Sequence, residues 1–331
     1  MLLSGPRAIV ILFISLLLLS ASSVYSQEKL TFGTAIKLAP VYYLPILAAQ
    51  EKGFWKAEGL DVEWVPFRGS TDMHRAIASG VMKLGMDLAV GQVRSVARGL
   101  PTMMVYYLQS EEGFSIWVSA ASPIKTPAQL KGAALGVPVL GGSADAYGRA
   151  AIKALGLEKQ LKFVGTGGQN PAMAALKTGA IQGLVNNIFP MLDLAVRGEV
   201  RELIGLSDYL PKPWMGHVVF SRSDFVKGSP ATVLKTVSGV RAAVDFIKRD
   251  PDWSRQTMVK VSGYSPDAAK KAYSIFRFTS DGEIKPEALK NITNFLIEYG
   301  MLEKEKAPAL EMFEKEKAPA LESLYTNKFI K

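Results

Sequence analysis

The stretch 31–85 switches between two kinds of apolar spacing, and this alternation constrains the fold more than any other feature of the sequence. Residues 31–37 have the short apolar pattern of a strand, whereas 44–52 has a helical pattern with a proline in its first turn and a glycine just past its end. Residues 60–64 alternate between apolar and acidic side chains, as a half-buried strand does, and a second helix and a third strand follow. This order predicts an extended βαβ unit and therefore an α/β fold.

The loop 67–72, between the second strand and the second helix, is a candidate contact with a ligand. Gly69 allows a ligand to approach the backbone, and Ser70 at the helix start leaves free N–H groups that an anion or a polar group can meet. In the alternative interpretation, Ser70 or Asp72 only caps the helix. The sequence leaves both interpretations open.

The first 26 residues predict export from the cytoplasm. They contain Arg7, an apolar run over 8–19 and small residues up to Ser26, which is typical of a signal peptide, and the run is too short to span a bilayer. We expect cleavage after Ser26, with cleavage after Ser23 as the alternative. The chain has no cysteine, which excludes a lipid-modified N-terminus, a disulfide and thiol chemistry, so a periplasmic protein is favoured over a lipoprotein.

Length and charge narrow the class further. With 331 residues, 48% of them hydrophobic, the chain can fill two cores, which predicts two lobes. The formal net charge of +9 falls to +8 when Arg7 leaves with the signal peptide. Export and the scattering of the basic residues argue against a nucleic-acid partner. The charge is then either a general property of the surface or a means of attracting an anionic ligand.

The third strand is predicted over 84–90, followed by a turn at Gly91-Gln92 and a helix that ends at Arg98-Gly99. Asp87 lies inside this strand, near the expected cleft, and a structural role is the favoured interpretation. A strand over 102–108 nearly completes the first lobe.

A second lobe is expected to begin after a crossing at Glu111-Glu112-Gly113, and its layout echoes that of the first. Its loop Gly141-Gly142-Ser143 joins a strand to a helix as Gly69-Ser70 does, and could cradle an oxyanion or an amide. The loop lacks the lysine of a P-loop and the third glycine of a dinucleotide fingerprint, so a nucleotide site is not predicted.

Three further polar or aromatic positions fall near the expected cleft. Asn186 and Asn187 follow a strand over 181–185, at the end where ligands of open α/β sheets bind, although adjacent asparagines are also simple turn formers. Trp214 precedes a return crossing at 218–220 and could either stack on a ligand or line the interface between the lobes. His74 and His217, the only histidines, are too few for a metal site and are expected to be structural.

The last third of the chain is predicted to be helical. Helices should start at Pro230, Pro251, Pro266 and Pro286, stop near Asp250, Gly263, Asp281-Gly282 and Gly300, and pack back on the first lobe. In the tail, the nine residues from Glu303 to Glu311 recur without change as Glu314 to Glu322, a tandem duplication with an 11-residue repeat that we expect to lie outside the fold.

A family resemblance rests on the segment Ala48-Ala49-Gln50-Glu51-Lys52-Gly53-Phe54-Trp55-Lys56-Ala57-Glu58-Gly59-Leu60-Asp61-Val62-Glu63, followed by Arg68-Gly69-Ser70 and Ala78-Ser79-Gly80. The chain resembles, over about 30–298, the periplasmic solute-binding proteins of the nitrate, sulfonate, taurine and thiamine-pyrimidine class, which deliver ligands to ATP-driven importers. It departs from the family at Lys83, where an acidic residue is usual, so any role of an acid there is in doubt.

The resemblance implies the type II periplasmic binding protein fold: two α/β lobes, each a mixed, mostly parallel sheet flanked by helices, joined by two hinge crossings. We expect 27–112 and 218–300 to form lobe I, 113–217 to form lobe II and 301–331 to be a tail. The cleft contacts implied by the resemblance or the cleft position are Lys37, Tyr42, Tyr43, Arg68, Gly69, Ser70, Thr71, Gly91, Gln92, Gly141, Gly142, Ser143, Asn186, Asn187 and Trp214.

The implied function is the capture of a small anionic or heteroaromatic ligand by a monomer and its delivery to an ABC permease and ATPase, with neither cofactor nor metal. A sensor subunit for a receptor is the first alternative. The second is an enzyme, because the fold includes the eukaryotic synthase of the thiamine pyrimidine. The resemblance implies that this type of enzyme depends on a cysteine-rich motif, and the present chain has no cysteine. It also has no paired carboxylates in a motif and no evident pair of nucleophile and base.

Overall fold

A computed structural model describes residues 27–34, 40–67, 70–110, 113–275, 277–304 and 325–330. Several predictions concern residues outside these ranges: the signal peptide, Lys37, Arg68, Gly69, the crossing at Glu111-Glu112 and the duplicated tail segment from residue 305 on. No helix among the described residues is both long enough and apolar enough to cross a membrane.

The first sheet has five strands in the order β2-β1-β3-β10-β4. Its strands β1, β2 and β3 are parallel, and β10 runs antiparallel between β3 and β4. The order strand, helix, strand, helix, strand predicted for 31–85 is therefore correct. The bounds are β1 (Glu28–Thr34), β2 (Leu60–Pro66), β3 (Leu84–Leu88), β4 (Thr102–Tyr107) and β10 (His217–Arg222).

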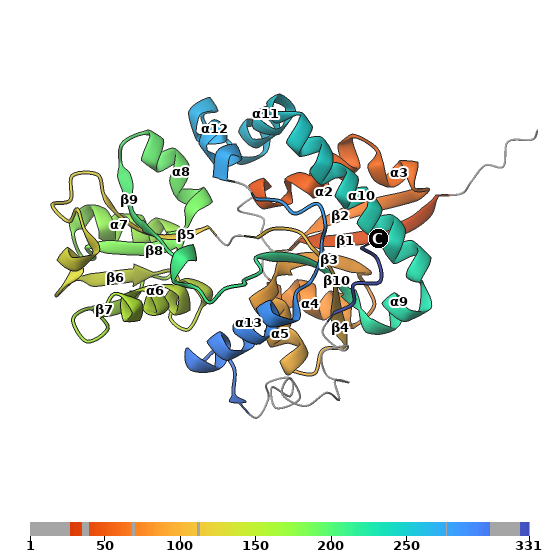
Figure 1. Cartoon of the computed structure of the whole chain (residues 1–331). Coiled ribbons are helices and arrows are strands. Elements are labelled where there is room, and N and C mark those ends of the chain that lie inside the picture. Colours follow the sequence, from red (N-terminus) through yellow and green to blue (C-terminus); the bar gives the residue numbers. More distant parts are fainter. Residues whose placement is uncertain are drawn as a thin grey trace, which may run out of the picture.

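The second sheet, in the order β7-β6-β8-β5-β9, has the same plan as the first. Strands β6, β7 and β8 are parallel, and β5 runs antiparallel between β8 and β9. The chain passes between the two sheets twice, from β4 to β5 and from β9 to β10, and the sheets lie side by side (Figure 1). The bounds are β5 (Phe114–Ser119), β6 (Ala134–Val137), β7 (Lys162–Gly165), β8 (Gly183–Asn187) and β9 (Val200–Gly205).

Helices flank both sheets, so that a strand such as β4 is buried along its whole length. The α-helices are α2 (Leu44–Glu51), α3 (Phe54–Ala57), α4 (Ser70–Ala78), α5 (Ala89–Ala97), α6 (Ser143–Ala154), α7 (Gln169–Thr178), α8 (Ile188–Val196), α9 (Ser223–Gly228), α10 (Pro230–Arg249), α11 (Pro251–Ser262), α12 (Pro266–Ile275) and α13 (Pro286–Glu298). Three short 3₁₀ helices are η1 (Pro40–Tyr43), η2 (Pro127–Leu130) and η3 (Ser207–Tyr209).

The four proline starts in the last third of the chain are confirmed, because α10, α11, α12 and α13 all begin at the predicted prolines. The predicted end of the third of these helices is wrong, since α12 stops at Ile275, ahead of Asp281.

The expected packing of these helices on the first sheet is correct for α10 and α13, which lie against α2 and α5, but wrong for α12. The hydroxyl of Tyr264, just before α12, donates to the backbone oxygen of Phe189 at 2.6 Å, and the Ser265 amide donates to Asp193 at 3.1 Å. These bonds attach α12 to α8 of the second sheet.

The predicted turn at Gly91-Gln92 is also wrong. Strand β3 ends at Leu88 and α5 begins at Ala89, so Gly91 and Gln92 lie in the first turn of the helix. The glycine has a packing reason: a Cβ at residue 91 would come within 2.7 Å of Asp87 Oδ2.

Candidate functional site

The carboxyl ends of the two sheets meet at Tyr42 and Asn187, two of the predicted contacts. Tyr42 lies in η1, shortly after β1, and Asn187 is the last residue of β8. The Asn187 side-chain amide donates a hydrogen bond to the Tyr42 hydroxyl, while its oxygen accepts the Phe189 amide at 3.1 Å and so caps α8. One asparagine therefore both begins a helix and bridges the two sheets.

Aromatic rings surround this bridge. The Tyr42 ring meets the Phe189 ring edge-on, with centroids 4.6 Å apart, and lies 4.4 Å from the ring of His217. His217 is the first residue of β10 and pairs with the last residue of β3. Burial lowers the pKa of His217 to about 4, with Asp87 acting weakly in the opposite sense, so the imidazole is neutral at pH 7.

Two more buried polar side chains, Asp87 and His74, follow His217 away from the bond between Asn187 and Tyr42. His74 Nε2 lies 2.9 Å from Asp87 Oδ2, and both side chains are buried. The sequence predicted structural roles for these residues and for His217, and of the three only Asp87 was expected near the cleft. A usable signal was present, because Asp87 and His217 are charged or titratable residues at strand ends that are otherwise apolar.

A cavity of about 300 Å³ opens between α4 and α5, and it brings together three more of the predicted contacts. Ser70 and Thr71 form the start of α4, and Gly91 lies in the first turn of α5. The complete lining is Ser70, Thr71, His74, Arg75, Gly91, Arg94, Ser95, Arg98 and Leu100.

The loop Gly141-Gly142-Ser143 is hydrogen-bonded to an acidic residue, Asp145, in the first turn of α6. The Gly141 amide donates to Asp145 Oδ2 at 2.8 Å, and Arg149 Nε donates to Asp145 Oδ1 at 2.8 Å. Gly141 has φ of +72°, which favours glycine, whereas Gly142 has an ordinary φ of −88°. The amide of Gly141 is thus already satisfied, and the N-terminus of α6 already has a carboxylate beside it.

Trp214 is buried between α6 and α13. Its ring packs edge-on against Tyr147 and Phe295, with centroid distances of 6.1 and 5.2 Å. The sequence left open whether Trp214 stacks on a ligand or lines the interface between the lobes, and this packing favours the second role.

Three remaining predicted contacts are buried beside the bridge or the cavity. Gln92 Nε2 donates to Thr102 at 2.9 Å, and Tyr43 packs against Trp64 with ring centroids 6.2 Å apart. Asn186 accepts the Asn187 amide at 2.9 Å. These side chains support the positions of their neighbours.

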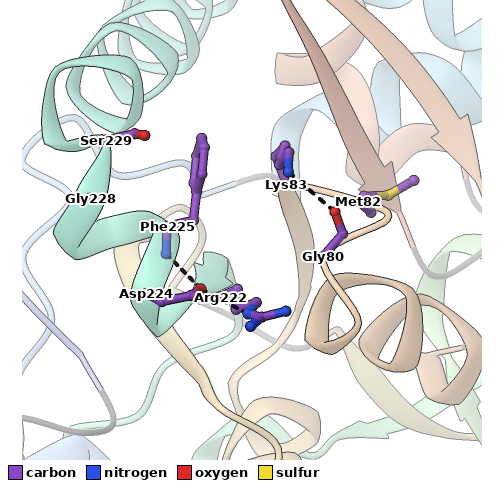
Figure 2. Close-up of a pocket in the computed structure, with 8 residues that line it drawn as sticks. All are labelled: Gly80, Met82, Lys83, Arg222, Asp224, Phe225, Gly228 and Ser229. Atoms are coloured by element: carbon purple, nitrogen blue, oxygen red, sulfur yellow. Dashed lines mark hydrogen bonds and ion pairs between the residues drawn. The ribbon is translucent and has the colours of Figure 1, made fainter.

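A second cavity, of about 320 Å³, lies at the other end of the first sheet (Figure 2), where β3 begins and β10 ends. Its charged side chains already have partners: Lys83 Nζ donates to the Gly80 carbonyl at 3.2 Å, and Arg222 Nε lies 2.8 Å from Asp224 Oδ1. It contains none of the predicted contacts. Lys83, the departure from the family pattern, lies here and faces the ring of Phe225.

Within the described ranges, no group of three or more His, Asp or Glu side chains is arranged to hold a metal ion.

The fold is that of the periplasmic binding proteins. The product of a conserved Candida albicans gene, described as having the generic periplasmic binding protein fold, superposes with a TM-score of 0.72 at 15% identity and covers 92% of this chain and 98% of that one. The periplasmic aliphatic sulphonate-binding protein SsuA of Escherichia coli gives a TM-score of 0.71 at 16% identity, over 85% of this chain and 91% of SsuA.

Sequence comparison identifies the family. A 4-amino-5-hydroxymethyl-2-methylpyrimidine phosphate synthase of Saccharomyces cerevisiae is 23% identical over 249 residues, which are 68% of this chain and 69% of the synthase. A putative binding protein of Brucella abortus is 24% identical over 271 residues, 78% of this chain and 83% of that protein. Residues 41–254 match the family described as NMT1/THI5 like, and the chain belongs to that family. The resemblance seen in the sequence is confirmed.

Proposed function

We propose that this chain is an extracytoplasmic solute-binding protein that captures a small ligand between two lobes and delivers it to an ABC permease and its ATPase. The observation that carries the proposal is the hydrogen bond from Asn187 to Tyr42, which joins the carboxyl ends of two separate sheets. Ligands of open α/β sheets bind at such ends, and a bond between the sheets provides a contact that closure can make and opening can break.

The proposed lobes follow the two sheets. Lobe I comprises 27–112 and 218–300, lobe II comprises 113–217, and 301–331 is the tail. The leader 1–26 directs export to the periplasm, where the chain acts as a monomer. SsuA is named a periplasmic aliphatic sulphonate-binding protein and the Brucella relative a putative binding protein, and both names support a binding role for this chain.

A ligand between the lobes would take over the polar groups of the bridge. When Asn187 and Tyr42 separate, the Asn187 amide can donate to a ligand and the Tyr42 hydroxyl can contact it, both beside the rings of Phe189 and His217. A flat or anionic solute can meet both groups, with ring contact on one side. The lining of the α4–α5 cavity supplies further contacts from lobe I.

We further propose that the protein is a carrier and has no enzymatic activity. The yeast relatives named as synthases make an enzyme the alternative, but the cysteine-rich motif implied for that enzyme type has no counterpart in a chain without cysteine. A sensor subunit that presents its closed form to a receptor would use the same bridge. Loss of solute uptake in a strain that lacks this protein supports the carrier, whereas normal uptake with a lost transcriptional response supports the sensor.

The direct test is a thermal-shift screen of nitrate, taurine, short alkanesulfonates and pyrimidines, followed by calorimetric titration of each hit. A ligand at 100 times its Kd stabilises the native state by about 2.7 kcal/mol. Asn187→Asp keeps the oxygen that caps α8 but removes the amide donor, and Tyr42→Phe removes the hydroxyl.

We expect both variants to bind the hit at least tenfold more weakly than wild type. Asn170→Asp, an exposed change of the same type on α7, is the matched control and should bind normally. Full affinity in both Asn187→Asp and Tyr42→Phe would remove the bridge from the site.

A further inference from the structure

The cavity between α4 and α5 is lined by three arginines and by no acidic residue. Arg94 lies on α5, Arg98 directly follows that helix, and Arg75 comes from the second turn of α4. Among the described residues, none of the three forms an ion pair or a side-chain hydrogen bond. By contrast, Arg222 of the second cavity, Arg149 of α6 and Arg197 just after α8 all have carboxylate partners.

Arg94 is the cation whose position is hardest to explain without a ligand. Its Nε is buried and has no hydrogen-bond partner within the described part of the chain. Burial, and then the charge of Arg98, lower the pKa of Arg94. Arg94 loses part of its hydration and meets the like charge of the exposed Arg98, and a bound anion would offset both effects.

His74 supplies an independent sign that the cavity is built for a ligand. The side chain is only 2% exposed and lines the cavity, and its Nδ1 has no partner among the described residues. Its Nε2 faces the Asp87 carboxylate at 2.9 Å, so that nitrogen carries a proton. Asp87 itself does not line the cavity. With the proton on Nε2, Nδ1 is an acceptor, so it can take a hydrogen bond from a hydroxyl or another donor group of the ligand.

The start of α4 completes the polar surroundings. Ser70 and Thr71 contribute hydroxyl groups, and the first backbone N–H groups of this helix have no intrahelical partners. Guanidinium groups and helix N-termini both bind tetrahedral oxyanions well, because each offers several N–H donors in a fixed arrangement.

We propose that the α4–α5 cavity binds the oxyanion group of the solute, of the sulfonate, sulfate or phosphate type, through Arg94, Arg98 and the start of α4. This proposal rests on the proposed function, which supplies the solute, and adds the chemical class of that solute. A free inorganic ion and the anionic group of an organic solute share this chemistry. The cavity volume of about 300 Å³ is at the lower end for small-molecule sites, which suits a compact solute.

The test is calorimetric titration of the mature protein with inorganic sulfate, inorganic phosphate, methanesulfonate and methyl phosphate, at an ionic strength fixed with sodium chloride. We expect at least one of the four to bind with a Kd below 1 mM, on the order of a typical small-solute site. Tighter binding of the organic anions assigns the site to a group on an organic solute, and tighter binding of the inorganic ions assigns it to a free ion.

Arg94→Gln should weaken that binding at least tenfold. Arg249→Gln, which removes the same charge from an exposed position at the end of α10, should leave it unchanged. Because the substitution removes a half-buried cation without a partner among the described residues, Arg94→Gln should melt no lower than wild type without ligand, so a loss of binding is not a loss of folding. Absence of binding in wild type, or equal affinity in wild type and Arg94→Gln, overturns the inference.

Failure of this inference and failure of the proposed function are separable. A protein that binds none of the four anions but is required for uptake of another solute contradicts the anion site alone. A protein that binds an anion through Arg94 but whose deletion leaves every uptake rate normal contradicts the transport role alone.

Discussion

The indole ring of Trp55 occupies the space that a side chain at residue 239 would need. A Cβ on Gly239 would come within 2.2 Å of the indole Cδ1, and the indole Nε1 donates to the Thr236 carbonyl at 3.0 Å. Trp55 belongs to α3 beside the first sheet, whereas Gly239 lies in the middle of α10, after the chain has passed through the second sheet and returned. This contact holds the last third of the chain against the first.

Gly239→Ala should therefore destabilise the protein. Overpacking a well-filled site costs about 1–3 kcal/mol, and the better helix propensity of alanine recovers about 1 kcal/mol of that. We expect a net fall of about 1–2 kcal/mol in the free energy of unfolding, measured by urea denaturation. Gly228→Ala is the matched control, because no atom lies within 4 Å of the Cβ it would add. A stable Gly239→Ala protein would show that the indole can move aside.

Asp145→Asn tests whether the acid beside Gly141 stabilises the start of α6. The amide oxygen can still accept from the Gly141 N–H, but the charge that faces Arg149 and the helix N-terminus is lost. We expect the free energy of unfolding to fall by about 1 kcal/mol, a typical size for a charge near a helix end. The comparison is Asp224→Asn, an exposed acid with its own arginine, for which a change below about 0.5 kcal/mol is expected.

The same Asp145 variant also tests the ligand role of Gly141, Gly142 and Ser143. If this loop contacts an anionic solute, removing the nearby carboxylate should raise affinity for that solute. Unchanged affinity in a folded Asp145→Asn protein would indicate that the loop is only a turn and a helix start.

The fold could be predicted where the signals are local. Alternation at 60–64 and prolines at helix starts act within a few residues, and β2, α10, α11, α12 and α13 begin where these signals lie. The start of α5 was missed because Leu88 precedes it without a capping side chain. Gly91 resembled a turn glycine, but it is required by a contact with Asp87.

The site could be predicted only in part. Tyr42 and Asn187 were expected near the cleft, but their bond to each other joins residues on two different sheets, and nothing local in the sequence specifies such a pair. Arg94 and Arg98 were overlooked because arginines on a helix are usually solvent-exposed. Only the position of α4 beside α5 shows that they line a cavity.

We expect the mature chain to begin at Gln27. Strand β1 starts at Glu28, so cleavage after Ser26 would leave the strand whole, and cleavage after Ser23 would add only three residues ahead of it. Intact-mass spectrometry of protein taken from the periplasm of an expressing strain distinguishes the two products. Recovery of the full 331-residue chain in the membrane fraction would contradict a cleaved leader.

The burial of His217 should make stability depend on pH. Its pKa is about 4 in the folded protein, against 6.5 for an ordinary histidine, so between these values the unfolded chain binds a proton that the folded chain does not. The free energy of unfolding therefore falls as pH drops below 6.5, and the loss from this group reaches about 3 kcal/mol below pH 4. Above pH 6.5 the contribution is constant.

Urea unfolding of wild type and His217→Gln at pH 8, 6 and 5 isolates this contribution, because the other titrating groups are common to both proteins. The difference in stability between wild type and variant should shrink by about 1 kcal/mol or more from pH 8 to pH 5, since glutamine does not titrate. A difference that stays constant over this range would show that His217 takes up its proton in the folded state as readily as in the unfolded one. The imidazole beside Tyr42 would then be charged at acidic pH and could meet an anionic solute directly.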